Sequence, residues 1–194
     1  MPAATDSTSA PIATLPEIEL VLGAHVERLK QRDLESFDEI YRLTRDQVAR
    51  VLFHLAAPGA DLERLVGDVY VRLFEELRGL PAGAPVRPAL YRACAKVAQQ
   101  RPPLFRRPAP RALAPNADPG AQAACLLQQA LARLPARERI VFVLNEVLGL
   151  SAKDVQAATE LSQSALDSHL RRARLALTEA LRFADEAAET EVAP

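Results

Sequence analysis

Several residue types are scarce in this 194-residue sequence, and each shortage excludes a class of protein. There is no tryptophan, and the two cysteines, Cys94 and Cys125, lie far apart and outside any CxxC or Cys/His cluster. We therefore expect reduced thiols and not metal ligands, with a regulatory disulfide as the alternative. No apolar run is long enough to span a bilayer, and no charged-then-apolar start suggests export. These absences predict a cytoplasmic protein without a membrane segment.

Sequence signatures of catalysis are also missing. His25, His54 and His169 are scattered without metal-ligand spacing, and there is no Gly-rich phosphate loop or nucleophile elbow. We therefore expect neither an enzyme nor a bound metal or cofactor. What the chain does have is alanine and leucine. A hydrophobic content of 49% with only 5% aromatic residues favours an all-α fold.

Apolar spacing and proline or glycine breaks divide the chain into two small helical domains joined by a proline-rich linker. The segments are a disordered N-terminus (1–14), an amphipathic helix (15–33), a first helical domain (34–100), a proline- and arginine-rich linker (101–120), a second helical domain (121–182) and an acidic tail (183–194).

The second domain contains the most informative pattern, a helix-turn-helix over residues 134–181. Ser151 and Asp154 have the spacing of a capping box that begins a short helix, and Ser162 is placed to cap a last long helix. In such a unit the first helix braces the second, which presents its polar face to a DNA groove. The candidate DNA-contacting residues are Ser162, Gln163, Ser164, Asp167, Ser168, Arg171, Arg172 and Arg174.

The overall charge argues against a strong DNA binder. The net charge is −1, whereas dedicated DNA-binding domains are usually basic. We find no well-placed acidic partner for Arg171, Arg172 and Arg174, which mildly favours an external anion as their partner. We therefore expect modest DNA affinity, with another partner supplying the rest.

Two stretches resemble bacterial sigma factors of the extracytoplasmic-function (ECF) type. The stretch LPARERIVFVLNEVLGLSAKDVQAATELSQSALDSHLRRARLAL is similar to region 4, with its Leu-Pro opening, Gly-Leu-Ser turn and Arg-Arg-Ala-Arg run. The stretch FDEIYRLTRDQVARVLFHLAAPGADLERLVGDVYVRLFEEL, followed by VRPALYRACAKVA, resembles region 2. The resemblance covers Leu34 to Leu181 and leaves the helix at 15–30 unexplained. It implies a transcription initiation factor with three partners: core RNA polymerase, promoter DNA and an anti-sigma factor that clamps the two domains.

The resemblance also assigns candidate sites, with departures from the family pattern. Arg64 and Gly67 stand where the family has an acidic residue and a glutamine, and Val86 and Ala89 stand where it has aromatic residues. Asp167 and His169 likewise replace a lysine and an arginine that the family often carries. The implied polymerase-binding residues are Asp61, Glu63, Arg64, Asp68 and Arg72. The implied −10 DNA-binding residues are Arg87, Tyr91, Arg92 and Lys96, although Tyr91 is equally well explained as a core aromatic.

Three alternatives to an initiating factor stay open. The eroded region 2 is also typical of a sigma mimic, which would bind an anti-sigma factor or another regulator without initiating transcription. The helix-turn-helix could belong to an ordinary regulator that binds duplex DNA as a dimer, joined through the helix at 15–30. Units of this kind also pack proteins together without touching DNA.

Overall fold

The computed structural model describes residues 15–56, 60–100 and 119–191, and these residues form helices and turns without any strand, so the all-α prediction is confirmed. The predicted disordered N-terminus and most of the predicted linker lie outside the described residues. The elements are α1 (Leu15–Lys30), α2 (Glu35–Leu55), α3 (Leu62–Arg78), α4 (Val86–Gln99), α5 (Pro119–Arg133), α6 (Ala136–Phe142), the π-helical turn η1 (Val143–Val147), α7 (Ala152–Thr159) and α8 (Gln163–Glu191).

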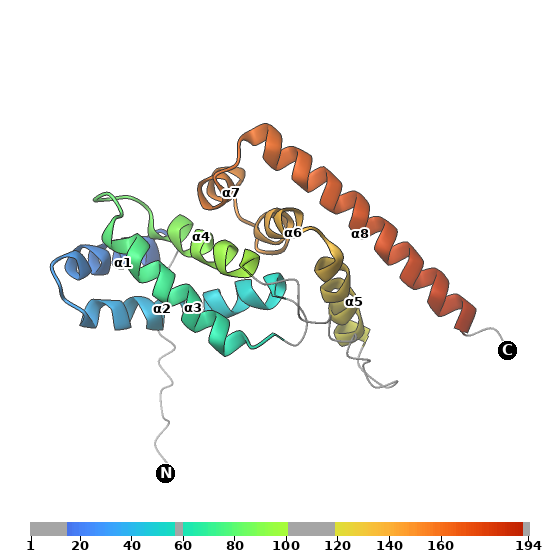
Figure 1. Cartoon of the computed structure of the whole chain (residues 1–194), viewed down its shortest axis with the longest axis horizontal. Coiled ribbons are helices and arrows are strands. Elements are labelled where there is room, and N and C mark those ends of the chain that lie inside the picture. The colour runs from blue at the N-terminus through green and yellow to red at the C-terminus, as the bar shows by residue number, and fades with distance from the viewer. Residues whose placement is uncertain (1–14, 57–59, 101–118, 192–194) are drawn as a thin grey trace, which may run out of the picture.

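Helices α1 to α4 form one bundle, which lies to one side of α5 to α8 in Figure 1. Each helix buries the apolar stripe that its spacing predicts, because these side chains leave water only when they face neighbouring helices. In α1 the buried residues are Leu22, Val26 and Leu29. Helix α1 packs on α2, α3 and α4, so it belongs to this bundle and is not an appendage.

The second unit comprises α5 to α8 and is built around a sharp turn between η1 and α7. Gly149 has a φ of 66°, a left-handed conformation that glycine adopts without steric cost. The side chain of Asn145 supports this turn, since its Nδ2 donates a hydrogen bond to the carbonyl oxygen of Leu150 at 3.0 Å. Beyond α7, helix α8 continues to Glu191, through most of the segment that composition sets apart as an acidic tail. No described helix is both long and apolar enough to cross a membrane.

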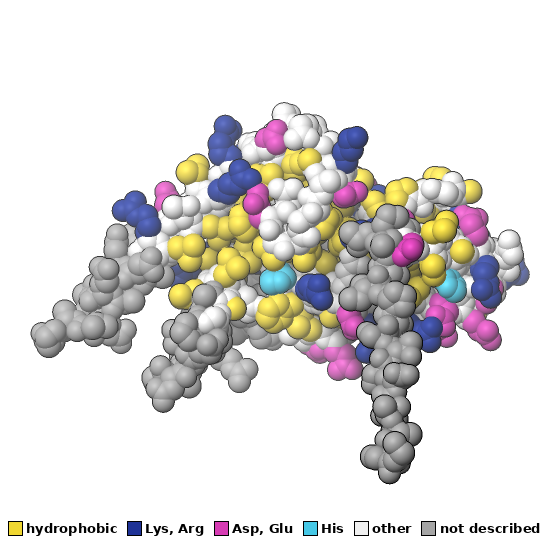
Figure 2. Space-filling model, turned by 180° about the vertical axis from the view of Figure 1, so that it is seen from behind, with side chains coloured by type: hydrophobic (Ala, Val, Ile, Leu, Met, Phe, Trp, Pro, Cys, Tyr) yellow, Lys and Arg dark blue, Asp and Glu magenta, His cyan; other side chains and the backbone are white. Residues whose placement is uncertain are grey.

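The two units share one buried apolar cluster to which all the helices contribute. Helix α4 is the joint: it packs on α3 in its own bundle and on α7 and α6 of the second unit, and Figure 1 shows α6 and α7 close to it. Figure 2 shows that apolar side chains are also exposed across the middle of the opposite face, between charged ones. The helix-turn-helix is therefore seated on the bundle of α1 to α4 through α4, and we call this the closed arrangement.

Candidate DNA and polymerase interfaces

The helix-turn-helix forms from the capping residues that the sequence predicts. The Ser151 Oγ accepts a hydrogen bond from the Asp154 N–H at 3.2 Å, and the Ser162 Oγ accepts one from the Ala165 N–H at 3.3 Å. Between the two helices, Glu160 takes a left-handed conformation that ends α7. Leu166 and Ala173 on α8 are buried, which places its polar residues on the outer face.

The candidate −35 residues lie on the outside of the molecule. Ser162, Gln163, Ser164, Asp167, Arg171, Arg172 and Arg174 are exposed, and Ser168 is half-buried. A chain of side-chain contacts orders the start of α8. Gln163 accepts a hydrogen bond from Gln156 at 2.6 Å and donates one to Asp167 at 2.9 Å. Asp167 is thus hydrogen-bonded on the surface, where its carboxylate remains an acceptor.

Two arginines of α8 are held by acidic residues of α6 and η1. Arg172 donates to Glu138 of α6 at 2.7 Å and to Ser168 at 2.9 Å, and Arg174 pairs with Glu146 of η1. The expectation that no acidic partner is available is therefore wrong for Arg172 and Arg174, because their partners lie on other elements and outside helical spacing. Arg171 is exposed and makes no hydrogen bond or ion pair with the described residues.

His169 lies between the same groups. Its Nδ1 accepts a hydrogen bond from Arg172 at 2.8 Å. Burial and, second, the positive charge of Arg172 lower the pKa of His169 below its ordinary value. The neutral ring is therefore favoured, and His169 adds no positive charge to the surface that would face DNA.

Among the candidate −10 residues on α4, Tyr91 is buried and the three cations are half-buried. Tyr91 is 3% exposed, and its hydroxyl accepts hydrogen bonds from Gln47 and from Arg87. The Arg87 guanidinium also lies 5.7 Å from the centre of the Tyr91 ring. This burial favours the core interpretation of Tyr91 that the sequence leaves open, because a ring in the core presents no face to an unpaired base. Val86 and Ala89, at the family's aromatic positions, are buried as well.

The other two candidates on α4 are bound to acidic or carbonyl groups. Lys96 Nζ lies 3.3 Å from Glu76 Oε1 on α3. Arg92 crosses to the second unit, where its Nη2 donates to the carbonyl oxygen of Ala157 at 3.0 Å and its Nε lies 3.7 Å from Glu160 Oε1. Ala157 is in the last turn of α7, whose carbonyl groups have no intrahelical partner and carry partial negative charge. Arg92 therefore joins the two units.

The candidate polymerase-binding residues lie at the N-cap of α3 and along the helix as far as Arg72. Asp61 caps the helix through the Arg64 N–H at 3.1 Å, and the Arg64 and Asp68 side chains lie 4.0 Å apart. Asp61, Glu63, Arg64 and Asp68 are exposed, and Arg72 is half-buried. Beside them is a groove of about 320 Å³ between α2 and α3, lined by Tyr41, Arg45, Asp46, Ala49, Glu63, Val66, Gly67 and Tyr70. Of the five residues, only Glu63 lines this groove.

Sequence reasoning missed the partners of these residues. Glu138, Glu146, Gln47 and Glu160 were not singled out, yet each holds a candidate site residue. Glu138, Glu146 and Gln47 lie on other elements than the residues they hold, 28 to 44 positions away in sequence. Glu160 ends α7, whereas its partner Arg92 lies on α4. Helical periodicity relates residues three or four positions apart, so it contains no signal for these pairs.

Comparison with known proteins supports the same assignment. Residues 126–177 match the family model described as Sigma-70, region 4. No curated protein matches the sequence. The fold is similar to that of CnrH, solved in complex with the cytosolic domain of CnrY, with a TM-score of 0.65 and 20% identity over 85% of this chain and 97% of that chain. A chain of the RsbN–BldN complex aligns with a TM-score of 0.35 and 17% identity, over 79% of this chain and 97% of that chain.

The family model and the structural likeness cover different lengths of the chain. The family model accounts for the helix-turn-helix, and the likeness to CnrH extends the shared fold to the first bundle. Residues 126–177 are therefore similar to sigma-70 region 4, as the sequence predicts, and the chain shares the fold of CnrH along 85% of its length.

Proposed function

We propose that this chain binds core RNA polymerase and directs it to specific promoters, with α8 entering the major groove of a −35 element. The observation that carries the proposal is the doubly capped helix-turn-helix, in which α7 braces α8 and leaves the polar face of α8 exposed. Arg171, Arg172 and Arg174 would bind phosphates and position the helix, and Ser164 and Asp167 would contact base edges. The exposed face of α3 would bind the polymerase.

The closed arrangement bears on how such a factor would be controlled. Arg92 and Lys96 of α4, which would contact promoter DNA, are held by acidic or carbonyl groups within the chain. Initiation would require these contacts to be exchanged for contacts with DNA. CnrH, which has this fold, was solved in complex with a domain of another protein. We propose by analogy that an anti-sigma factor binds this chain and stabilises the closed arrangement.

The test is a binding and transcription experiment with purified bacterial core RNA polymerase and the full chain. Stoichiometric binding, followed by promoter-dependent transcription from a genomic promoter library, would support the proposal. No open complex on any promoter would overturn it. Arg64→Asp restores the family's acidic residue at an exposed position of α3, and Arg64→Gln is the matched control that removes the positive charge alone.

A sigma mimic is the second candidate, and the burial of Tyr91 favours it. A base stacked on an aromatic side chain contributes roughly 1–3 kcal/mol. At 3% exposure, Tyr91 provides none of this without leaving the core, and Val86 and Ala89 offer no ring. The mimic predicts stable binding to an anti-sigma factor and no binding to core polymerase or to −10 single strands. Sequence-specific strand separation would exclude it.

A further inference from the structure

Two prolines leave the N-terminus of α4 with an unusual set of hydrogen-bond donors. The N–H groups of a helix's first turn have no intrahelical partner and need an acceptor from elsewhere. In α4 these positions are Pro85, Val86, Arg87 and Pro88, and proline has no N–H. Only the N–H groups of Val86 and Arg87 therefore need an acceptor. Pro85 occupies the N-cap position and has no side-chain acceptor to offer.

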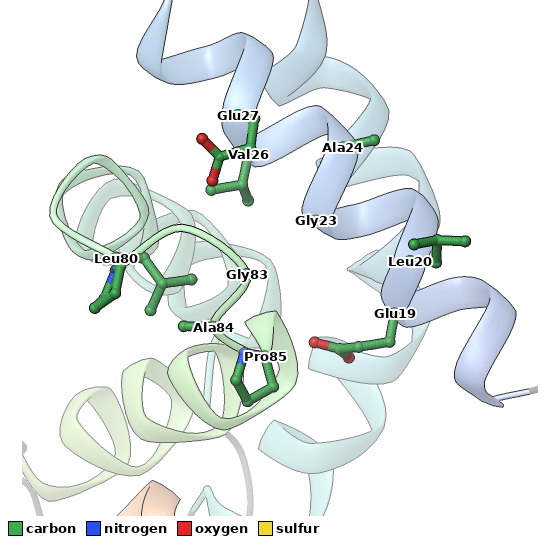
Figure 3. Close-up of a pocket in the computed structure, with 11 residues that line it drawn as sticks. Glu19, Leu20, Gly23, Ala24, Val26, Glu27, Leu80, Gly83, Ala84 and Pro85 are labelled. Carbon is green, nitrogen blue, oxygen red and sulfur yellow. The ribbon is translucent and has the colours of Figure 1, made fainter.

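A single carboxylate oxygen from α1 satisfies both donors. Glu19 Oε1 accepts hydrogen bonds from the Val86 N–H and, at 3.2 Å, from the Arg87 N–H. Figure 3 shows the Glu19 side chain extending from α1 toward Pro85, where the turn between α3 and α4 ends. A carboxylate at this position also interacts favourably with the partial positive charge of a helix N-terminus. Glu19 thus does for α4 what an N-cap residue normally does for its own helix.

The packing of α1 keeps Glu19 in this position. Leu22 and Val26, one and two turns further along α1, are buried. The second carboxylate oxygen of Glu19 is also buried, and it has no hydrogen-bond partner among the described residues. Burying Oε2 without a partner costs free energy, and the two hydrogen bonds that Oε1 accepts offset this cost and hold the carboxylate at the start of α4. Glu19 also lines an apolar groove of about 580 Å³ between α1 and the residues from Leu80 to Pro85.

We propose that Glu19 is a positioning residue for α4, and that capping α4 is the role of the N-terminal helix α1. Losing the cap would free the first turn of α4, which carries Arg87. Arg87 bonds to Tyr91, and Arg92 of the next turn bonds to the second unit. The link from this cap to promoter opening rests on the proposed function of α4, whereas the cap itself does not.

The first experiment measures amide hydrogen exchange at Val86 and Arg87 by NMR in the full chain. First-turn amides normally exchange freely, so their protection in the natural chain would be a direct sign of the cap. We expect Glu19→Ala to speed exchange at both amides at least about fivefold and Glu19→Gln to have a smaller effect, because its amide oxygen still accepts. The control, Glu75→Gln, removes an exposed carboxylate of α3 that makes no hydrogen bond or ion pair with the described residues.

A rescue variant separates positioning from general stability. Pro85→Asp in the Glu19→Ala background supplies an N-cap acceptor within α4 for the Arg87 N–H, at a residue whose φ of −65° and ψ of 134° suit an N-cap. We expect it to restore protection at Arg87. Unprotected amides in the natural chain, or Glu19→Ala exchange equal to that of Glu75→Gln, would overturn the proposal.

The second experiment compares promoter opening by polymerase with the natural chain, Glu19→Ala and the rescue variant. Slower opening with Glu19→Ala, restored by Pro85→Asp, supports the link between the cap and α4 function. Equal opening rates despite a lost cap overturn that link. If the natural chain opens no promoter, the proposed function fails, while the exchange data still decide the role of Glu19.

Discussion

Replacing Arg92 with alanine should loosen the closed arrangement of the two units. Arg92 donates one hydrogen bond, at 3.0 Å, to the Ala157 carbonyl at the end of α7. A hydrogen bond from a charged donor contributes about 1.5–3 kcal/mol when buried, and Arg92, at 29% exposure, retains part of that. The contact with Glu160 spans 3.7 Å, and Glu160 is 69% exposed, so it adds about 0–1 kcal/mol.

Together these contacts stabilise closure by about 1–2 kcal/mol, which corresponds to a change of about tenfold in the ratio of closed to open molecules. The apolar packing of α4 on α7 remains in the variant. Arg92→Ala should therefore shift the equilibrium without unfolding either unit. Glu160→Gln removes only the ion pair and should change the ratio less than about fivefold.

Single-molecule energy transfer between dyes on α3 and α8 measures this ratio. The exposed residues Glu75 and Glu179 are suitable labelling positions after Glu75→Cys and Glu179→Cys, with Cys125→Ser to leave no other accessible thiol. Lys153→Ala, an exposed position of α7 without an ion pair among the described residues, is the control. If Arg92→Ala matches this control, the hydrogen bond does not hold the units together and apolar packing alone does.

Three further predictions concern other parts of the molecule. Glu138→Gln should free Arg172 for phosphate and raise duplex DNA affinity about two- to fivefold with a steeper salt dependence, measured by fluorescence anisotropy; unchanged affinity would contradict it. Gly67→Ala should stabilise α3 by about 0.5–1 kcal/mol because a Cβ there meets nothing within 4 Å, and a lower Tm would refute this. Burial raises the pKa of Cys94 to about 12 from 9.0, so a thiol reagent at about pH 8 should modify Cys125 alone in the folded chain. The protonated Cys94 thiol is favoured on folding, so stability should fall as the pH rises above 9, and an unchanged Tm there would count against it.

The parts of the fold that the sequence predicts well are those determined by near neighbours. The N-caps Ser151 and Ser162 form as expected, because a cap is decided within three residues. Leu166 and Ala173, at helical spacing, are buried, and Gly149 takes the left-handed conformation that glycine commonly adopts after a helix. The position of each helix and the face that it buries therefore follow from local sequence patterns.

Contacts between distant segments decide the rest. Arg172 and Arg174 look free in sequence because their acidic partners come from α6 and η1. Tyr91 is suited by type either to stack on a base or to fill a core, and only the packing of α2 against α4, with Gln47 on its hydroxyl, distinguishes the two. The role of Glu19 also depends on a contact with residues 67 and 68 positions away. A single sequence contains no periodic signal for such pairs.

Under the proposed function, these distant contacts would make activation an exchange of partners. Each candidate DNA-contacting cation on α4, and two of the three candidates on α8, already interacts with groups of the chain itself. These groups are Glu76, Glu138, Glu146, Tyr91 and the end of α7. DNA phosphate would replace one set of hydrogen-bond acceptors with another, so each exchange yields only a small net free energy. Such exchanges would change an equilibrium between closed and open molecules only slightly, and the apolar packing of α4 on α7 also favours the closed form. A partner protein that binds the closed form about tenfold more tightly than the open form shifts this equilibrium about tenfold when it saturates the chain.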